Sequence, residues 1–393
     1  MAELPFRDIM APRVREEQYR GGHSPPAYSA CAATNQIPNR ETFMNDAMPT
    51  NDSSAERENF YAQIDPLNLA PLWERVHSSV TSDPNSPAKP AHWNYDDDVR
   101  PFLMQAGGLI TAKEATRRVL ILENPGLRGR ASITQSLFAG LQLILPGEVA
   151  PAHRHTQSAL RFIIEGKGAY TAVEGERAVM QPGDFIVTPN WAWHDHGNET
   201  DQPMVWMDGL DTPIIRLLDA NFTEMADIDR LELIRPPGDS LARYGANMLP
   251  VDWRPMNRNS PVFTYPYERS RDALVTLERN GDPDPCHGHK MRFINPATGD
   301  APMPTIGAFM QLLPKAFTTG AYRSTDGTIY AVVEGEGETV IGNIVFRWKP
   351  RDVFVVPSWA WHHHRADSEA VLFSFSDRPL QQTLGVWREE RQR

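Results

Sequence analysis

Cysteine is scarce in this chain, with Cys31 and Cys286 the only two among 393 residues. Two thiols cannot build a disulfide framework, so we expect a cytoplasmic protein in a reducing compartment. Long apolar runs are also missing. No stretch reaches the roughly 18 apolar residues that a membrane-spanning helix needs, and the N-terminal residues lack the apolar centre of a signal peptide.

An excess of positive charge is absent as well. Lys and Arg number 39 against 50 Asp and Glu, and no block of basic residues stands out. These features exclude a nucleic-acid-binding or membrane-surface protein. Hydrophobic residues make up 40% of the chain, which excludes a wholly disordered polypeptide. The 34 prolines and 26 glycines indicate short strands joined by turns rather than a helical bundle.

Apolar patterning divides the chain into six segments. Short apolar runs bounded by Gly and Pro, such as LQLILPGE and DFIVTPNW, recur in two stretches with the spacing of an antiparallel barrel. A helical pattern precedes the first stretch, with Leu67, Leu72 and Val76 as predicted buried positions. The predicted segments are an irregular arm (1–54), a helical lead-in and linker (55–99), a first barrel (100–212), a helical connector with the start of the second unit (213–299), a second barrel (300–380) and a tail (381–393).

An internal repeat relates the two barrel segments. GDFIVTPNWAWHDH (183–196) aligns with RDVFVVPSWAWHHH (351–364), and LPGEVAPAHRH (145–155) aligns with LPKAFTTGAYR (313–323). His194 and His362 are 362 − 194 = 168 positions apart. The recurrence of PxWAWHxH at the matching place indicates that one β-domain has been duplicated.

Three histidines of the first copy are candidate metal ligands. His153 and His155 are two positions apart in a strand-like segment, so both imidazoles project from the same face. An adjacent antiparallel strand would bring His194 alongside them. Three neutral imidazoles hold a divalent metal and leave positions open for reactants. Spacing alone does not choose between iron, manganese, cobalt and zinc.

The second copy lacks this ligand set. The alignment places Ala321 and Arg323 at the positions of the HxH pair, and His362 alone remains. One imidazole does not hold a metal, so we predict a metal-free, structural barrel. His363 and His364 are predicted to form a surface or interface cluster.

The spacing of glycine, proline and histidine around these ligands resembles a known superfamily. The frame G-x5-H-x-H-x10-G, followed by G-x5-P-x4-H-x3-N, is similar to the two cupin motifs. The resemblance implies a mainly β bicupin, with two cupin-type antiparallel barrels and flanking helices. Two positions depart from the pattern, because Ala159 replaces a frequent glutamate ligand and Trp191 replaces the usual glycine. The missing carboxylate leaves a three-histidine site.

Longer segments resemble the gentisate 1,2-dioxygenase family, which includes salicylate and 1-hydroxy-2-naphthoate dioxygenases. They are RRVLILENPGL (117–127), GLQLILPGEVAPAHRHTQSALRFIIEGKGAYT (140–171) and TPNWAWHDHGNE (188–199). The resemblance implies a cytosolic homotetramer that uses Fe(II) and O2 to open the ring of an aromatic hydroxy acid. For gentisate, the ring opens between the carboxyl-bearing and hydroxyl-bearing carbons to give maleylpyruvate, a step in aromatic catabolism.

A buried anionic substrate needs a cationic partner. Arg161 lies six residues after His155, and the resemblance makes it the substrate-carboxylate or oxyanion contact. Strand alternation sends Arg117 and Arg118 to opposite faces, and the resemblance suggests that Arg117 reaches the pocket.

Four further residues of the first barrel are candidate pocket residues. His196 is a candidate acid or base toward the substrate or bound oxygen. Asp208 matches a pocket position of the family and, if buried, needs His196 or an arginine as partner. Gln142 is a candidate for orienting the ring substituents. Trp206 either walls the aromatic pocket or packs in the core.

Several alternative functions remain open at this stage. Within the same class, the substrate could be salicylate, a substituted salicylate or 1-hydroxy-2-naphthoate. A non-catalytic ligand-binding bicupin would be expected to lose its ligands in both barrels, and a metal-dependent isomerase would want a carboxylate base where Ala159 stands. Cys286, His287 and His289 form a rival metal cluster, but no second half of a zinc motif follows them.

Overall fold

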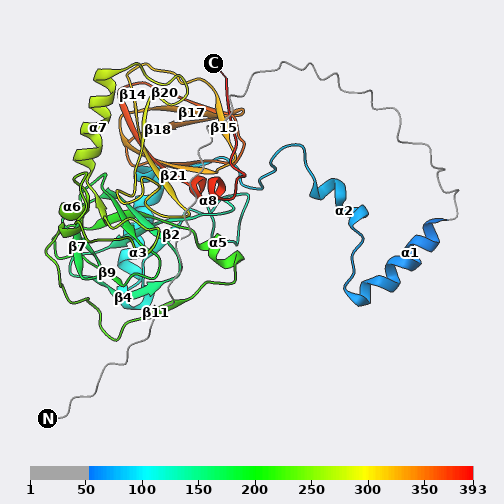
Figure 1. Cartoon of the computed structure of the whole chain (residues 1–393), viewed down its shortest axis with the longest axis horizontal. Helices are drawn as coiled ribbons and strands as arrows, with labels where there is room; N and C mark the ends of the chain where they lie inside the picture. The colour runs from blue at the N-terminus through cyan, green and yellow to red at the C-terminus, as the bar shows by residue number, and fades with distance from the viewer. Residues whose placement is uncertain (1–52, 393) are drawn as a thin grey trace, which may run out of the picture. The chain divides into compact units, whose positions relative to one another are not determined.

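The computed structural model describes residues 53–392 (Figure 1). The predicted arm lies outside this range except for its last two residues. The chain divides into one unit that ends at Val76 and a second that begins at His77. No helix among the described residues has the length and apolarity to cross a membrane.

The first unit is helical, as its sequence pattern predicts. Its elements are α1 (Ser53–Ile64), a 3-10 turn (Asp65–Leu67) and the start of α2 (Leu72–Ser79). The prediction that Leu67 and Leu72 are buried is wrong, because their exposed fractions are 66% and 67%. Residues 53–76 of this unit form no sheet or second layer of helices against which an apolar face could pack.

The first barrel consists of two antiparallel sheets. The six-stranded sheet has the order β12-β8-β5-β10-β3-β2, and the five-stranded sheet has the order β11-β4-β9-β6-β7. The strands are β2 (Val119–Ile121), β3 (Phe138–Ile144), β4 (Val149–His155), β5 (Ala159–Glu165), β6 (Tyr170–Val173), β7 (Glu176–Val179), β8 (Phe185–Thr188), β9 (His194–Gly197), β10 (Met204–Leu210), β11 (Thr223–Met225) and β12 (Thr264–Tyr265).

The second barrel repeats this architecture. Its sheets have the orders β1-β19-β16-β21-β14-β13 and β18-β17-β20-β15-β22. The predicted mainly β fold with two antiparallel barrels is therefore confirmed. The strands are β1 (Ala91–Trp93), β13 (His289–Arg292), β14 (Gly307–Leu313), β15 (Tyr322–Ser324), β16 (Thr328–Glu334), β17 (Gly337–Ile341), β18 (Ile344–Trp348), β19 (Val353–Val356), β20 (His362–Ala366), β21 (Ala370–Ser376) and β22 (Glu389–Arg391).

The two six-stranded sheets share one hydrophobic core. Strand β14 directs Ala308, Met310 and Leu312 into a cluster that also contains residues of the first barrel. Phe162 of the first barrel stacks on Phe373 of the second, with ring centroids 4.1 Å apart. Because alternate residues of a strand point to opposite faces, the remaining positions of these strands face the barrel interiors. That alternation sets which side chains can line a site.

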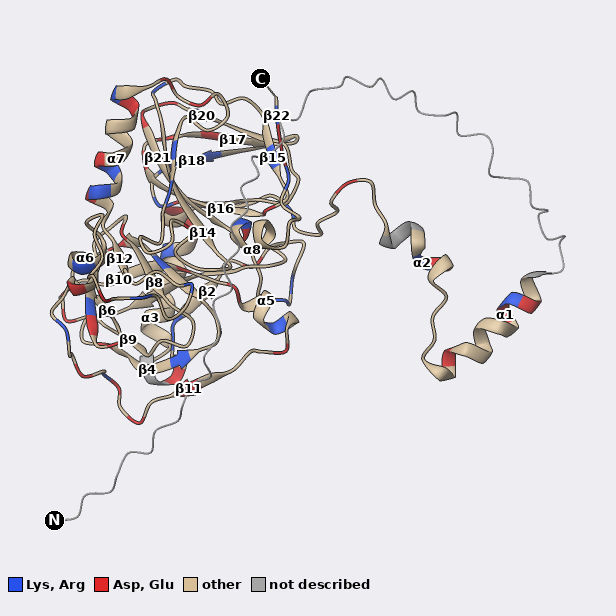
Figure 2. Cartoon of the chain, viewed as in Figure 1, with Lys and Arg blue, Asp and Glu red and all other residues tan. Residues whose placement is uncertain are grey.

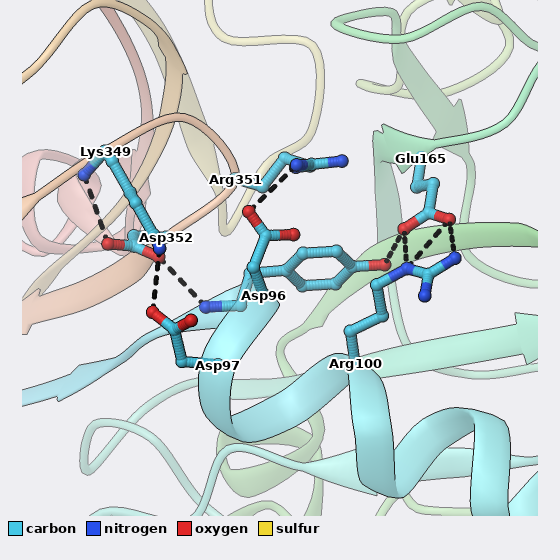
Figure 3. Close-up of polar contacts among 8 residues, drawn as sticks. Asp96, Asp97, Arg100, Glu165, Lys349, Arg351 and Asp352 are labelled. Atoms are coloured by element: carbon cyan, nitrogen blue, oxygen red, sulfur yellow. Dashed lines mark hydrogen bonds and ion pairs between the residues drawn. The ribbon is translucent and has the colours of Figure 1, made fainter.

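A short helical segment links the barrels through polar contacts, drawn in Figure 3. It comprises a π-helical turn (Tyr95–Val99) and α3 (Arg100–Leu109). Arg100 forms an ion pair with Glu165 of β5, and the Tyr95 hydroxyl donates to the same carboxylate at 2.8 Å. On the other side, the Tyr95 amide donates to Asp352 and Arg351 pairs with Asp96. The segment therefore fixes elements of both barrels.

The remaining helices lie outside the sheets. Both acidic and basic residues occur along α7, which lies along the second barrel (Figures 1 and 2). Its contacts are with β13 and β14. The helices are α4 (Ala112–Ala115), α5 (Thr212–Leu217), α6 (Asp239–Tyr244), α7 (Tyr267–Asn280) and α8 (Arg378–Thr383).

The strand register corrects one detail of the sequence alignment. His153 pairs with His194 in the first barrel, and Tyr322 pairs with His362 in the second. The residues at the HxH positions are therefore Tyr322 and Ser324 rather than Ala321 and Arg323. A shift of one residue along a strand moves every side chain to the opposite face. The alignment assumed a constant offset of 168, whereas 322 − 153 gives 169 here.

Stacking contacts on the outer face agree with this register. Arg154 lies over the rings of Trp191 and Trp193 at 4.4 and 4.6 Å. Arg323 lies in the same way over Trp359 and Trp361, at 4.3 and 4.7 Å. Arg323 is thus the counterpart of Arg154 and points out of the barrel.

The predicted surface cluster of histidines is also wrong in part. His364 is buried, with 2% of its surface exposed, and its Nδ1 lies 2.8 Å from the Thr339 hydroxyl. It occupies the place that His196 has in the first barrel, where Nδ1 lies 2.9 Å from the hydroxyl of Thr171. Alternation along β20 turns His364 inward together with His362.

Candidate metal centre and active site

One group of three potential metal ligands is found among residues 53–392, formed by His153, His155 and His194. Their ligand nitrogens all lie within 4.8 Å of one another, and all three side chains are buried. The first two come from β4, and antiparallel pairing places His194 of β9 opposite His153. The structure thus brings together the three side chains that the sequence predicts as ligands.

Backbone carbonyls fix the tautomer of each ring. The Nδ1 atoms of His153, His155 and His194 lie 2.9, 3.0 and 2.9 Å from the carbonyl oxygens of Pro151, Gln157 and Ala192. A carbonyl oxygen only accepts, so each Nδ1 carries the hydrogen and each Nε2 keeps its lone pair. Such outer hydrogen bonds hold metal-binding imidazoles in place. The three rings therefore fit a divalent cation.

The protonation of these rings supports the same conclusion. Burial, with help from the Arg117 guanidinium, lowers the pKa of His153 to about 2 and that of His155 to about 4. Burial also lowers the pKa of His194 well below its usual value, and its Nε2 has no hydrogen-bond partner among the described residues. Neutral imidazoles are the form that a metal requires.

Trp191 supplies the turn that precedes His194. Its backbone φ is 63°, a left-handed conformation that glycine adopts most readily, and Trp359 repeats it in the second barrel at 62°. Stacking of Arg154 on Trp191 is a favourable contact that a glycine could not make. The departure from the cupin glycine thus keeps the backbone shape and adds an outer-face contact.

Arg161 is the most enclosed charged group beside the metal centre. It projects from β5 with 1% of its surface exposed, and its Nε lies 3.5 Å from Oδ1 of Asp208 on β10. The guanidinium also donates to the Thr188 hydroxyl and, over 3.1 Å, to Nε2 of His196. Burial lowers the pKa of Arg161 and raises that of Asp208, while each charge favours the other. The partner required by a buried Asp208 is therefore Arg161.

Arg117 and Arg118 point to different places. Arg118 forms an ion pair with Glu148, with Nη2 and Oε1 2.8 Å apart, away from the histidines. The Arg117 guanidinium donates to Nε2 of His153, and Arg117 also lines the cavity. Burial and the nearby Arg161 lower the pKa of Arg117 to about 10.

Two cavities meet beside the histidines. One of about 230 Å³ is lined by Arg117, His155, Arg161 and Asp208, and one of about 300 Å³ is lined by Arg117, His153 and His155. Both share Arg117, His155 and the start of α5. Together they are large enough for a small organic ligand. Cationic side chains beside a metal centre suit an anionic one.

Comparison with known proteins places these features in a family. The cupin domain model matches residues 140–210 and 308–375. A gentisate 1,2-dioxygenase from Aquipseudomonas alcaligenes is 60% identical over 86% of this chain and 96% of its own length. A 5-aminosalicylate 1,2-dioxygenase from Comamonas sp. is 40% identical over 82% of this chain and 87% of its own. The chain belongs to the gentisate 1,2-dioxygenase family.

A solved structure extends the family relationship to the fold. The crystal structure of salicylate 1,2-dioxygenase from Pseudoaminobacter salicylatoxidans, with gentisate adducts, is 32% identical with a TM-score of 0.81. The match covers 89% of this chain and 96% of that chain. The protein is a metal-binding, ring-cleaving dioxygenase of the bicupin type.

Three of the predicted pocket residues do not line the two cavities of this family member. His196 is fully buried and both of its ring nitrogens have protein partners, Arg161 and Thr171. Trp206 is a core residue whose Nε1 donates to Asp208 at 3.0 Å. Gln142 is buried with an unpartnered Oε1.

The sequence reasoning missed one strand of the site. The segment after the first barrel was predicted to be helical, yet Thr223–Met225 forms β11, which pairs with the ligand strand β4. Thr223 and Met225 line the larger cavity, as do Gln157 and Asn221. The only local signal for this strand would have been the β-branched Thr223, since its three residues are too few for a period.

Proposed function

We propose that the protein is an Fe(II)-dependent gentisate 1,2-dioxygenase. On this proposal it cleaves gentisate with O2 between the carboxyl-bearing and hydroxyl-bearing carbons to give maleylpyruvate. The observation that carries the proposal is the buried His153, His155 and His194 triad beside a cationic cavity, in a chain 60% identical to a gentisate 1,2-dioxygenase. Three imidazoles do not select iron by themselves. Iron is proposed because the family reaction consumes O2.

The metal would be held by the three Nε2 atoms. When bound there, Fe(II) supplies redox chemistry toward O2 and adjacent positions for oxygen donors. An aromatic 2-hydroxy acid offers two such donors, the carboxylate and the neighbouring hydroxyl. Proximity of both reactants then favours cleavage of the bond between the carbons that carry them.

Arg161 is proposed as the residue that binds the substrate's carboxylate or its developing oxyanion. Its side chain is already held by Asp208, Thr188 and His196, so little conformational entropy is lost when a ligand binds. Arg117, at the cavity wall, is proposed to add a second positive charge. Both arginines stay charged at neutral pH, so neither serves as the catalytic base.

His196 is proposed as a positioning residue. The arginine donates to its Nε2, which therefore accepts, and Nδ1 donates to the Thr171 hydroxyl. Neither nitrogen is free to exchange a proton with a ligand in this arrangement. Asp208 acts in the same way through Arg161, with Trp206 holding its carboxylate. Gln142 lies on the same inner face but lines neither cavity, so we propose no direct contact between it and the ring substituents.

The deciding experiment compares substrates on one preparation. The purified chain would be loaded with Fe(II) under anaerobic conditions, and O2 uptake would be followed with gentisate, salicylate, 5-aminosalicylate and 1-hydroxy-2-naphthoate. Gentisate is expected to have the highest kcat/KM, with near-ultraviolet absorbance from the opened product. Protein loaded with Zn(II), which is redox-inactive, serves as the matched control. A clear preference for one of the other acids would overturn the choice of gentisate but keep the reaction class.

Oligomeric state and location complete the proposal. We infer a cytoplasmic homotetramer, supported by the family and by the scarcity of cysteine. Mass measurement in solution and fractionation of the source cells test these two statements separately.

A further inference from the structure

A second cavity lies at the mouth of the C-terminal barrel, in the position that corresponds to the active-site entrance. It has a volume of about 380 Å³ and is lined in part by Gly307 and Phe309 of β14 and by the start of α8. In the first barrel, the cavity beside the metal centre is lined by the equivalent β3 and by the start of α5. The duplication has thus preserved an opening at the end of each barrel.

The charge of this second cavity is positive. Its lining includes Arg258, Arg292 and Arg378, against a single acidic residue, Asp300. Arg378 is neutralised by the buried Asp326, with Nε and Oδ2 3.2 Å apart. Neither Arg258 nor Arg292 forms an ion pair with any carboxylate in the part of the chain that the structure describes. Arg292 Nη2 donates to the Gly299 carbonyl over 3.4 Å, which leaves its positive charge uncompensated. Both guanidinium charges can therefore attract an anionic ligand.

Apolar side chains line part of the remaining wall, beside the polar Gln382 and Thr383. Phe293, Phe309 and Met303 line the same cavity. The Arg378 guanidinium lies 5.1 Å from the centroid of the Phe309 ring, which stands where Gly140 stands in the first barrel. An inorganic anion would gain nothing from these rings, whereas an anion with a hydrocarbon body would bury apolar surface against them.

Unpartnered polar groups continue from this mouth into the barrel. Lys290 of β13 lies near Phe309, with Nζ 5.2 Å from the ring centroid. Beside it, Gln311 and Ser374 are buried, and neither the Gln311 amide nor the Ser374 hydroxyl has a hydrogen-bond partner among residues 53–392. Buried polar groups without partners are rare and indicate water or a ligand.

We propose that the C-terminal barrel binds a small organic carboxylate at this mouth, with Arg258 and Arg292 contacting the carboxylate and Phe309 contacting the hydrocarbon part. Guanidinium groups bind carboxylates through paired hydrogen bonds, which suits this ligand better than a single point charge would. The site needs no metal and shares no residue with the metal centre. It gives the barrel that has lost its metal ligands a binding role.

The test measures binding of labelled maleate and, separately, labelled benzoate to the Fe(II)-loaded chain without oxygen. Maleate represents a ring-opened dicarboxylate, and benzoate an aromatic acid. We expect a site whose affinity falls about tenfold or more in R258Q/R292Q, because each lost charged hydrogen bond weakens binding by that order. Arg279→Gln, which removes an exposed arginine on α7 instead, is the matched control and should bind like the parent chain.

Further variants separate this site from the active site. Arg161→Ala should weaken any binding in the first barrel but leave the proposed site intact. Arg292→Lys keeps the charge and should recover part of the affinity. Binding of either probe that depends on Arg258 and Arg292 supports the proposal. The proposal is overturned if neither probe binds outside the first barrel. It is also overturned if the R258Q/R292Q variant has the circular dichroism spectrum of a folded protein and binds both probes as tightly as the parent chain.

Discussion

The side chains of Arg161 and His196 are joined inside the first barrel, with Nη2 3.1 Å from Nε2. On its other side the imidazole meets Thr171. The second barrel keeps the same histidine–threonine pair, as His364 and Thr339, but has no arginine at the matching strand position. The pair is therefore part of the duplicated scaffold. The arginine at this position is present only in the barrel with the three-histidine group, since Tyr330 occupies the matching place in the other.

Removal of one metal ligand tests the centre directly. The His155→Ala variant keeps two of the three imidazole ligands. Loss of a hydrogen bond that only orients a metal ligand lowers metal affinity roughly 10–100-fold, so loss of the ligand itself is expected to lower iron affinity by more. Turnover should disappear while circular dichroism stays unchanged, because the side chain lines a cavity rather than the core. Iron content after dialysis and O2 uptake are the measurements. A variant that retains iron and normal turnover would refute the ligand assignment.

Arg161→Ala tests the anion contact. We expect kcat/KM to fall by about 10–100-fold, since a charged hydrogen bond contributes about 1.5–3 kcal/mol, while iron content stays normal. The substitution also leaves the buried carboxylate of Asp208 without its ion-pair partner. The double variant Arg161→Ala/Asp208→Asn removes that unpaired charge. It should therefore be more thermally stable than Arg161→Ala but no more active. Unchanged kinetics in the single variant would remove Arg161 from the substrate site.

The corrected register predicts that a metal site can be rebuilt in the second barrel. Tyr322→His/Ser324→His places two imidazoles on the inner face beside His362, so bound metal should rise from one to two per chain. Ala321→His/Arg323→His is the matched control, because Arg323 faces outward over Trp359. Metal analysis after loading distinguishes them. A second metal in the control, or none in the test variant, would contradict the register.

Lys290 gives a pH-dependent prediction. Burial, with the nearby Arg378, lowers the pKa of Lys290 from 10.5 to about 7. Between these values the unfolded chain binds more protons than the folded one, so this residue makes stability rise with pH. In the Lys290→Met variant, this contribution to the increase of stability with pH should be absent. Urea unfolding at about pH 7 and about pH 9.5 should show the parent gaining stability relative to the variant at the higher pH. Parallel pH dependence in the two proteins would count against a lowered pKa of the buried Lys290.

The sequence by itself determined what depends on local spacing. A period of two places His153 and His155 on one face wherever the strand lies, and the recurrence of PxWAWHxH fixes the duplication. The glycines and prolines between short apolar runs indicate a fold rich in β-strands. These features need no knowledge of which strands become neighbours.

Tertiary structure decided what depends on pairing between distant strands. The Arg161–Asp208 ion pair exists because β5 and β10 are paired in register, and β11 lies over the ligands because it pairs with β4. The faces of Tyr322 and Arg323 were misassigned for the same reason. Register is set by hydrogen bonding and packing across the sheet, and an error of one residue inverts every face, so local periodicity cannot supply it.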